Sequence, residues 1–226
     1  SVSDGVRGGS RNKYDCLSYW NYVWVWIQMI IKLNNPKSET YKQLKNVILS
    51  HNFPWYYNNT STPNYKSYGE EEHIDLPFYG HILLSRPEEN KFTVKESSYF
   101  DLVKKLFDEV VEFNHLSDKY FFLRSCVNCV HPESKTTYSV PHNDHEFDHK
   151  NVLIYLTDAG GKTYVDNDFY DPCEDDIIVF SGKHYIESPK DKRRIVLIST
   201  IATWWGRIMN VKLLRIVTGE EVIAEL

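Results

Sequence analysis

From Lys119 to residue 203 the chain is a succession of short β-rich runs, and this pattern limits the possible fold more than any other feature of the sequence. Gly160, Gly161 and Gly182 separate several of the runs. Many short strands with turn signals between them are typical of a sandwich or a barrel, and here they predict a jelly roll. The strands are expected at residues 119–131, 136–140, 150–157, 162–166, 176–181 and 193–203.

Two amphipathic helices are expected ahead of these strands. The first covers residues 38–50, with Tyr41, Leu44 and Ile48 on one face. The second opens at Ser98–Asp101, which has the spacing of a capping box. Its apolar stripe would consist of Tyr99, Leu102, Val103, Leu106, Val110 and Phe113. Residues 52–97 are expected to be mostly loop, so the predicted fold is mainly β with N-terminal helices packed on it, an α+β arrangement.

The length of 226 residues suits one sizeable domain. We assign residues 29–205 to that domain, residues 1–28 to an extension outside its core, and residues 206–226 to a tail of uncertain origin whose sequence resembles the opening of small phage Sm-like proteins. The formal charge of −5 comes without a basic stripe, which speaks against a large nucleic-acid interface.

The compartment is inferred from two features. The apolar run Tyr19–Ile31 is too short to span a bilayer and lacks a signal-peptide cleavage site, so no membrane is expected. Cys126 and Cys129 form a CxxC pair within a predicted strand, where residues three apart face opposite sides. This placement disfavours a shared zinc or redox site. Because nothing requires disulfides, the prediction is a cytoplasmic protein.

The strongest chemical signal is His142-Asn143-Asp144 followed by His184. In an extended segment, residues two apart point to the same side, so His142 and Asp144 would share one face. Two imidazoles and a carboxylate that leave coordination positions open form the metal-binding set of non-haem iron oxygenases. Arg194 follows ten residues after His184, and a guanidinium can grip a carboxylate with two hydrogen bonds. A triplet of this kind taken alone is also common in solvated turns.

The segments around these residues keep a recognisable order along the chain. They are the strand Asn151–Leu156, the segment Thr157–Thr163 with its paired glycines, the strand Asp176–Phe180 before His184, and Ser188-Pro189 before Arg194. This succession resembles the iron(II)- and 2-oxoglutarate-dependent oxygenase family, particularly its prolyl-hydroxylase-like and phage-encoded branches. The resemblance covers Met29 to Trp204 and is strongest from Val140 to Thr200.

The resemblance implies a double-stranded β-helix, the cupin-like form of the jelly roll. It implies that His142, Asp144 and His184 bind Fe(II) and that Arg194 pairs with the far carboxylate of 2-oxoglutarate. Dioxygen would be the second co-substrate, and the products would be succinate, carbon dioxide and a hydroxylated substrate. If the protein is phage-encoded, it would act in the host cytoplasm.

Other residues are assigned less directly. Tyr138 and Tyr155 are expected to help bind the co-substrate, and Arg124 to line the same pocket, although packing is an equal alternative for each. Arg193 would face outward if Arg194 faces inward, because neighbours on a strand alternate. Val196 departs from the serine or threonine of many family members. A protein or peptide side chain is slightly favoured as substrate, with a small molecule or a nucleobase open, and the sequence does not indicate the oligomeric state.

Two other functions remain open at this stage. His145-Glu146-Phe147-Asp148-His149 matches the HExxH signature of zinc metallopeptidases, which requires a helix so that both histidines share a face. Pro141 just before it and the strand from Asn151 leave little room for such a helix. The remaining alternative is a non-catalytic jelly-roll binding module.

Overall fold

A computed structural model describes residues 30–60, 73–116, 119–203, 211–215 and 221–225. The predicted extension over residues 1–28 lies outside these ranges. The helices are α1 (Glu39–Leu49), α2 (Pro87–Asn90) and α3 (Phe100–Phe113). The strands are β1 (Ile30–Leu33), β2 (Tyr56–Asn58), β3 (His73–Ile74), β4 (Phe78–Leu84), β5 (Tyr120–Val130), β6 (Tyr138–Ser139), β7 (Lys150–Tyr155), β8 (Thr163–Val165), β9 (Asp168–Tyr170), β10 (Ile177–Phe180), β11 (His184–Ile186), β12 (Arg194–Thr203), β13 (Val211–Arg215) and β14 (Glu221–Glu225). Within the described ranges, no helix is long and apolar enough to cross a membrane.

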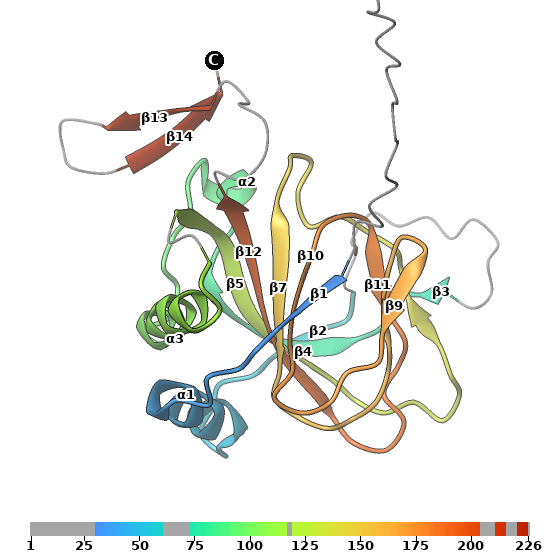
Figure 1. Ribbon diagram of the computed structural model, residues 1–226. Helices are drawn as coiled ribbons and strands as arrows, with labels where there is room; N and C mark the ends of the chain where they lie inside the picture. Colours follow the sequence, from blue (N-terminus) through green and yellow to red (C-terminus); the bar gives the residue numbers. More distant parts are fainter. Residues whose placement is uncertain (1–29, 61–72, 117–118, 204–210, 216–220, 226) are drawn as a thin grey trace, which may run out of the picture.

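Two β layers form the body of the molecule. The larger is an antiparallel sheet in the order β1-β10-β7-β12-β5-β4-β2, and the smaller has the order β11-β8-β9 (Figure 1). Isolated bridges from Tyr138 to Glu187 and from His142 to His184 attach the chain around β6 to β11. From β5 to β12 the chain thus alternates between the layers, with β8 and β9 forming a hairpin in the small one, which confirms the predicted double-stranded β-helix of jelly-roll type.

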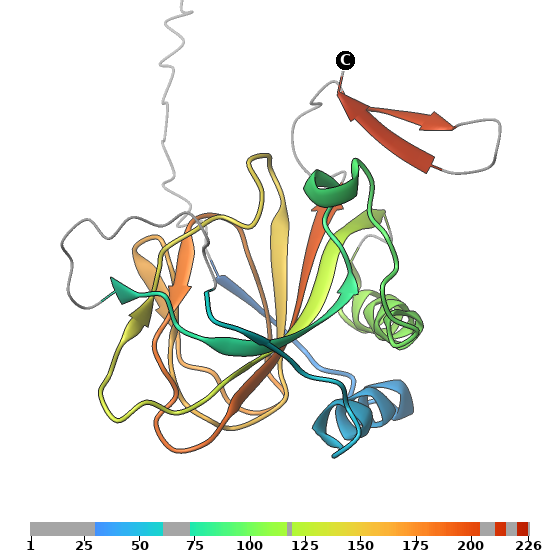
Figure 2. The same ribbon diagram turned by 180° about the vertical axis from the view of Figure 1, so that it is seen from behind.

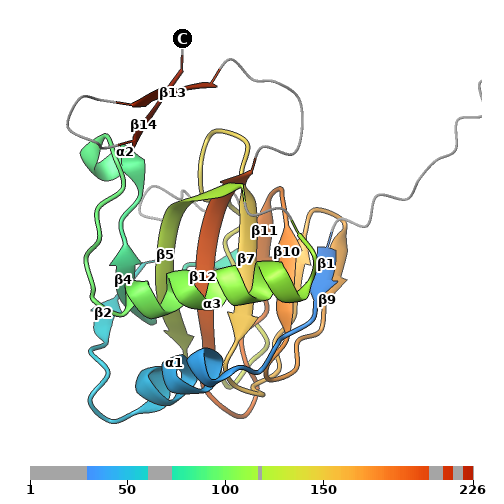
Figure 3. The same ribbon diagram turned by 60° about the vertical axis from the view of Figure 1, so that its left-hand side comes forward.

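Side-chain alternation along β7 separates the interior of the barrel from its outer face. Leu153 and Tyr155 belong to the apolar cluster inside the barrel. Val152 and Ile154 belong to the cluster on the other face, where α1 and α3 pack. Figure 3 shows α3 lying across that face of the large sheet, and both helices lie far from β11 and β9 in Figures 1 and 2. The helices therefore bury the outer face of the sheet and leave the interior to the functional site.

The first helix matches its prediction. Ser38 is the N-cap of α1, and its hydroxyl accepts a hydrogen bond from the Tyr41 N–H at 3.2 Å. Tyr41, Leu44 and Ile48 are buried as expected. The predicted capping box of the second helix is wrong. Helix α3 has Tyr99 as its N-cap, with no side-chain capping bond, because Ser98 lies in the preceding turn.

The prediction that residues 52–97 are mostly loop missed four short elements, since β2, β3, β4 and α2 lie there. Strand β4 pairs along β5 and extends the large sheet. Gly80 lies within β4, and a glycine inside a strand weakens the sequence pattern by which the strand is recognised. A Cβ atom at this position would come within 3.1 Å of the Phe78 ring and 3.2 Å of the Asn58 amide. Close packing against Phe78 and Asn58 therefore explains why this position is a glycine.

The side chains of Cys126 and Cys129 lie on opposite faces of β5, as the strand prediction required. Cys129 lies in the cluster beneath the helices, and Cys126 pairs with Ile198, which packs against the interior cluster. Both are free thiols, and burial raises the pKa of each. Nothing in their positions links them to a metal. Strands β13 and β14 form a separate two-stranded sheet within the predicted C-terminal tail.

Candidate metal centre

The two histidines of the predicted set are joined through their backbones. The His142 N–H donates to the His184 carbonyl at 3.0 Å, and the His184 N–H donates to the His142 carbonyl at 2.9 Å. Their ring centroids lie 4.6 Å apart. One ligand atom from each of His142, Asp144 and His184 lies within 4.8 Å of the others. This bridge between the segment after β6 and the start of β11 thus brings together residues that are distant in sequence.

Backbone carbonyls set which nitrogen each ring offers. The Nδ1 atom of His142 lies 2.9 Å from the Val140 carbonyl, and that of His184 lies 3.3 Å from the Gly182 carbonyl. With the proton on Nδ1, each ring leaves its Nε2 lone pair for a metal. Burial is the main reason that the pKa of His184 falls to about 4, with His142 adding to the effect and Asp144 opposing it. His184 is therefore neutral, as a metal ligand must be.

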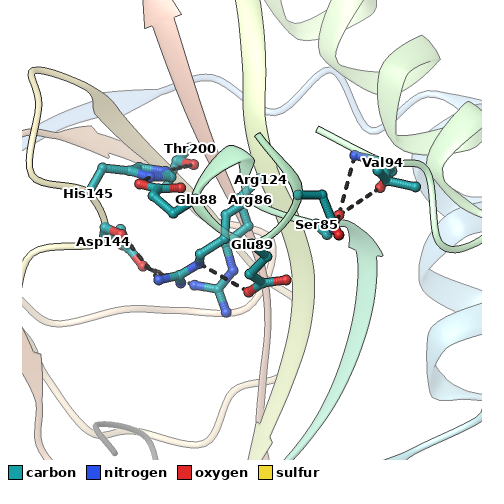
Figure 4. A network of polar contacts seen from close by, with 10 residues as sticks. Ser85, Arg86, Glu88, Glu89, Val94, Arg124, Asp144, His145 and Thr200 are labelled. Atoms are coloured by element: carbon teal, nitrogen blue, oxygen red, sulfur yellow. Dashed lines mark hydrogen bonds and ion pairs between the residues drawn. The ribbon is translucent and has the colours of Figure 1, made fainter. Parts of the chain in front are cut away.

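One carboxylate oxygen of Asp144 binds arginine side chains, and the other is available to a metal. Its Oδ1 accepts from Arg124 Nη1 at 3.0 Å, with Arg86 Nη2 at 3.8 Å (Figure 4). Its Oδ2 is buried without a hydrogen-bond partner among the described residues, 3.5 Å from His184 Nε2. Burial alone would raise the pKa of Asp144, but Arg124 and the neighbouring histidines hold that pKa well below its usual range. The carboxylate is therefore ionised at neutral pH.

These donors fit a divalent metal. A buried carboxylate oxygen without a partner is costly, and a metal bonded to it would remove that cost. Two neutral imidazole nitrogens and one carboxylate oxygen on one side of a site match the set that holds Fe(II) with open positions. Within the described ranges, this is the one group of three or more such side chains that lies close enough to bind a metal.

Arg194 lies in the same interior and is 4% exposed. Its Nη2 donates to Thr163 Oγ1 at 2.9 Å, and its Cζ lies 5.2 Å from the centroid of the Tyr155 ring. The Tyr155 hydroxyl lies 2.7 Å from the same Thr163 oxygen. No carboxylate of the described chain pairs with Arg194, and its Nε has no partner there. A buried cation without a counterion is strongly unfavourable, so this position calls for an anionic ligand. Arg193 is exposed, as strand alternation predicted.

The structure does not bring Tyr138 to these residues. Its ring packs edge-to-face against Tyr164 at 5.8 Å and Tyr185 at 6.0 Å. Tyr164 and Tyr185 alternate along β8 and β11 with Thr163 and His184, so they occupy the opposite face of the small sheet. The aromatic rings hold Tyr138 on that outer face, whereas the Tyr155 ring lies beside Arg194.

The HExxH interpretation is wrong because its segment contains no helix. His145 is buried, with Nδ1 at 2.6 Å from Glu88 Oε1 and Nε2 at 2.7 Å from Thr200 Oγ1 (Figure 4). Both ring nitrogens therefore have partners already, and Glu146 is exposed. The segment instead borders a cavity of about 330 Å³ beside the metal-binding carboxylate. The cavity is lined by Arg86, Glu88, Asn143, Asp144, His145 and Glu146.

Sequence reasoning missed two contributors to the site, Arg86 and Glu88. Both lie in or next to α2, within the segment expected to be loop. Arg86 Nη1 donates to the Asp144 carbonyl at 3.3 Å, and Glu88 holds His145. No local pattern marks such residues, since they reach the site only through the turn between β4 and α3.

Sequence and structure comparisons differ in what they find. No protein-family model matches the chain, and no curated protein matches it in sequence. Among solved structures, it is similar to an oxidoreductase of the 2OG-Fe(II) oxygenase family from Burkholderia pseudomallei, with a TM-score of 0.51 and 11% identity over 77% of this chain and 85% of that one. This similarity shows the fold.

Two prolyl hydroxylases are also similar in structure. One is the Trichoplax adhaerens enzyme in complex with a hypoxia inducible factor peptide, with a TM-score of 0.48 and 15% identity over 78% of this chain and 84% of that one. The other is the viral collagen prolyl hydroxylase of Paramecium Bursaria Chlorella virus-1, with a TM-score of 0.39 and 18% identity over 55% of this chain and 78% of that one. Cupin domains are similar as well, among them the one from Schizosaccharomyces pombe Cnp3.

Proposed function

We propose that this protein is an iron(II)- and 2-oxoglutarate-dependent dioxygenase that hydroxylates its substrate. The observation that carries the proposal is that one barrel interior holds both a metal-binding set and a buried arginine with no carboxylate partner among the described residues. The metal-binding set alone would suit many kinds of metalloprotein, and the buried arginine alone would suit any anionic ligand. Together they suit a co-substrate that chelates a metal at one end and carries a second carboxylate at the other, which describes 2-oxoglutarate.

His142, Asp144 and His184 would hold Fe(II) through two Nε2 atoms and Oδ2. Fe(II) bound there would supply the chemistry that couples decarboxylation of 2-oxoglutarate to hydroxylation of a substrate C–H, with one atom of dioxygen going into succinate and the other into the substrate hydroxyl. Backbone contacts on both Nδ1 atoms orient the rings. The ion pair with Arg124 orients the carboxylate.

Arg194 would bind the far carboxylate of 2-oxoglutarate, with Thr163 and Tyr155 fixing the guanidinium. The hydrogen bond to Thr163 and the ring of Tyr155 restrict its orientation, so little side-chain freedom is lost on binding. The apolar residues between Arg194 and the metal site would exclude water and strengthen this ion pair. They include Leu153, Val165, Ile178 and Val196.

The substrate would enter through the cavity beside Asp144. This cavity opens at the mouth of the barrel next to Arg86, Asn143 and Glu146, on the side of α2. Its lining is polar and carries both signs of charge. We propose a protein or peptide side chain as the group that is oxidised, because a mouth of this kind can hold a segment of polar backbone.

The test is iron-dependent formation of succinate from 2-oxoglutarate by the purified protein. The wild-type protein should release succinate with Fe(II), and His184→Ala should abolish that release. His51→Ala is a matched control, because His51 is an exposed histidine in the turn after α1. Metal binding without any succinate release in the wild-type protein would favour the binding-module alternative instead.

A further inference from the structure

A row of inward-facing side chains crosses the large sheet at the level of the metal-binding residues. Strand pairing places Arg124 opposite Thr200, Thr200 opposite Asn151, and Asn151 opposite Phe180. Asn151 alternates with Leu153 and Tyr155 of the interior cluster, so it faces the barrel interior. This row forms the wall that faces the metal site from the large sheet.

Three members of the row have partners close to the metal site. Arg124 binds Asp144, and Thr200 bonds His145. The Phe180 ring packs edge-on against His184 with centroids 5.1 Å apart.

Asn151 differs from the other three. Its side chain is 0% exposed, and neither Nδ2 nor Oδ1 has a hydrogen-bond partner in the described part of the chain. A buried amide without partners costs free energy, so a ligand that supplies them would bind there with an advantage.

His149 adds a second unpartnered atom two residues before Asn151. Its Nδ1 lies 2.8 Å from the Phe147 carbonyl, so in the neutral ring the hydrogen is on Nδ1 and Nε2 is an acceptor. That Nε2 is buried and has no partner among the residues described. The His149 ring also packs edge-on against His145 at 4.8 Å, which fixes it at the mouth of the barrel.

The chemistry of these atoms selects the ligand. Asn151 Oδ1 and His149 Nε2 each require a donor, whereas Asn151 Nδ2 requires an acceptor. A carboxylate has no hydrogen to donate and satisfies only Nδ2. A peptide segment carries N–H donors and C=O acceptors on neighbouring amide groups and so satisfies both kinds. We propose that Asn151 and His149 form a subsite that binds an amide group of the substrate, so that the substrate is a peptide. This inference rests on the proposed oxygenase function.

The first experiment compares thermal unfolding of ligand-free variants. Asn151→Leu replaces an amide without partners by an apolar group of similar volume, so Tm should stay the same or rise. The matched control is Asn114→Leu. The Asn114 side chain donates to the Val110 and Asn34 carbonyls at 2.9 and 2.8 Å and accepts from the Asn34 N–H at 2.8 Å. Because Asn114→Leu loses these hydrogen bonds, the Tm of that variant should fall. An equal fall for Asn151→Leu would mean that Asn151 is a structural residue and would overturn the proposal.

The second experiment measures succinate release in the presence of blocked tripeptides. A mixture of acetylated, amidated tripeptides should stimulate release by the wild-type protein, and matched depsipeptides, with esters in place of amides, should not. Asn151→Leu should need roughly 10–100-fold more peptide for the same stimulation, the loss expected for two hydrogen bonds. Asn151→Asp, which keeps an acceptor and loses the donor, should be impaired as well, whereas Asn114→Leu should respond like the wild type.

The outcomes separate the two proposals. Absence of succinate under every condition would refute the oxygenase function, and the peptide subsite with it. Succinate release that no peptide stimulates, or that Asn151→Leu and depsipeptides leave unchanged, would overturn the amide subsite alone.

Discussion

Arg124 Nη1 donates to Asp144 Oδ1 at 3.0 Å, and this contact decides which oxygen of the carboxylate remains for a metal. Arg124 comes from β5 of the large sheet, whereas Asp144 follows β6, which is attached to the small one. The ion pair therefore links the two layers at the mouth of the barrel. It also supplies a positive charge that keeps the carboxylate ionised while it is buried, because that charge lowers the pKa of Asp144.

Replacing Arg124 by methionine should weaken metal binding about 10–100-fold, the usual cost of removing a group that orients a metal ligand. The affinity can be measured by calorimetric titration with Co(II) as a stable substitute for Fe(II). Arg124→Lys should retain part of the affinity, because it keeps the charge but loses the planar geometry. Exposed Arg193→Met is the control, and an unchanged Co(II) affinity in Arg124→Met would contradict the role given to Arg124.

Replacing Arg194 by methionine should raise the 2-oxoglutarate concentration for half-maximal succinate release. Loss of a charge-assisted hydrogen bond costs roughly 1.5–3 kcal/mol, which corresponds to about 10–100-fold. Arg193→Met should leave this concentration unchanged, because Arg193 faces solvent. If both variants behaved like the wild type, the co-substrate would have to bind elsewhere.

Metal binding should stabilise the folded protein. At a concentration 100 times the dissociation constant, a bound metal adds about 2.7 kcal/mol, which for a domain of this size raises Tm by roughly 5–10 °C. Scanning calorimetry with and without Mn(II) would measure the shift, and a chelator should reverse it. Asp144→Ala should show no shift. A shift that survives in this variant would place the metal at another site.

Asp175 should make folding stability depend on pH below about 4. Burial alone would raise its pKa, but hydrogen bonds from Lys45, Tyr41 and Lys37 lower it from 3.8 to about 2. Because the folded pKa is depressed, the stabilisation is complete above pH 3.8 and is lost as the pH falls through 2. Because solvent screens this partly exposed carboxylate, its size is reduced to roughly 1 kcal/mol. Acid unfolding monitored by circular dichroism should lose this component in Asp175→Asn, while exposed Asp158→Asn should retain it.

Several parts of the site could be predicted from sequence because they depend on local periodicity. The two-residue spacing of His142 and Asp144 places both on one side of an extended segment, and the structure brings them together with His184. Alternation likewise distinguished buried Arg194 from exposed Arg193. The position of Tyr138 could not be derived in this way, because the face that it occupies depends on the pairing of β6 with distant segments near β3 and β11.

The sequence by itself determined the strand-rich pattern, the amphipathic face of α1, and the residue types suited to a metal and an anion. It determined the face of α3 only in part, because Phe113 of the predicted stripe is exposed and Phe107 is buried in its place. Only the tertiary structure decided that β4 joins the large sheet, that Arg124 and Arg86 hold Asp144, and that Asn151 is left without partners among the described residues. The physical reason is that periodicity acts between near neighbours in the chain. Side-chain partners across a barrel depend on strand register and closure, which exist only once distant segments have paired.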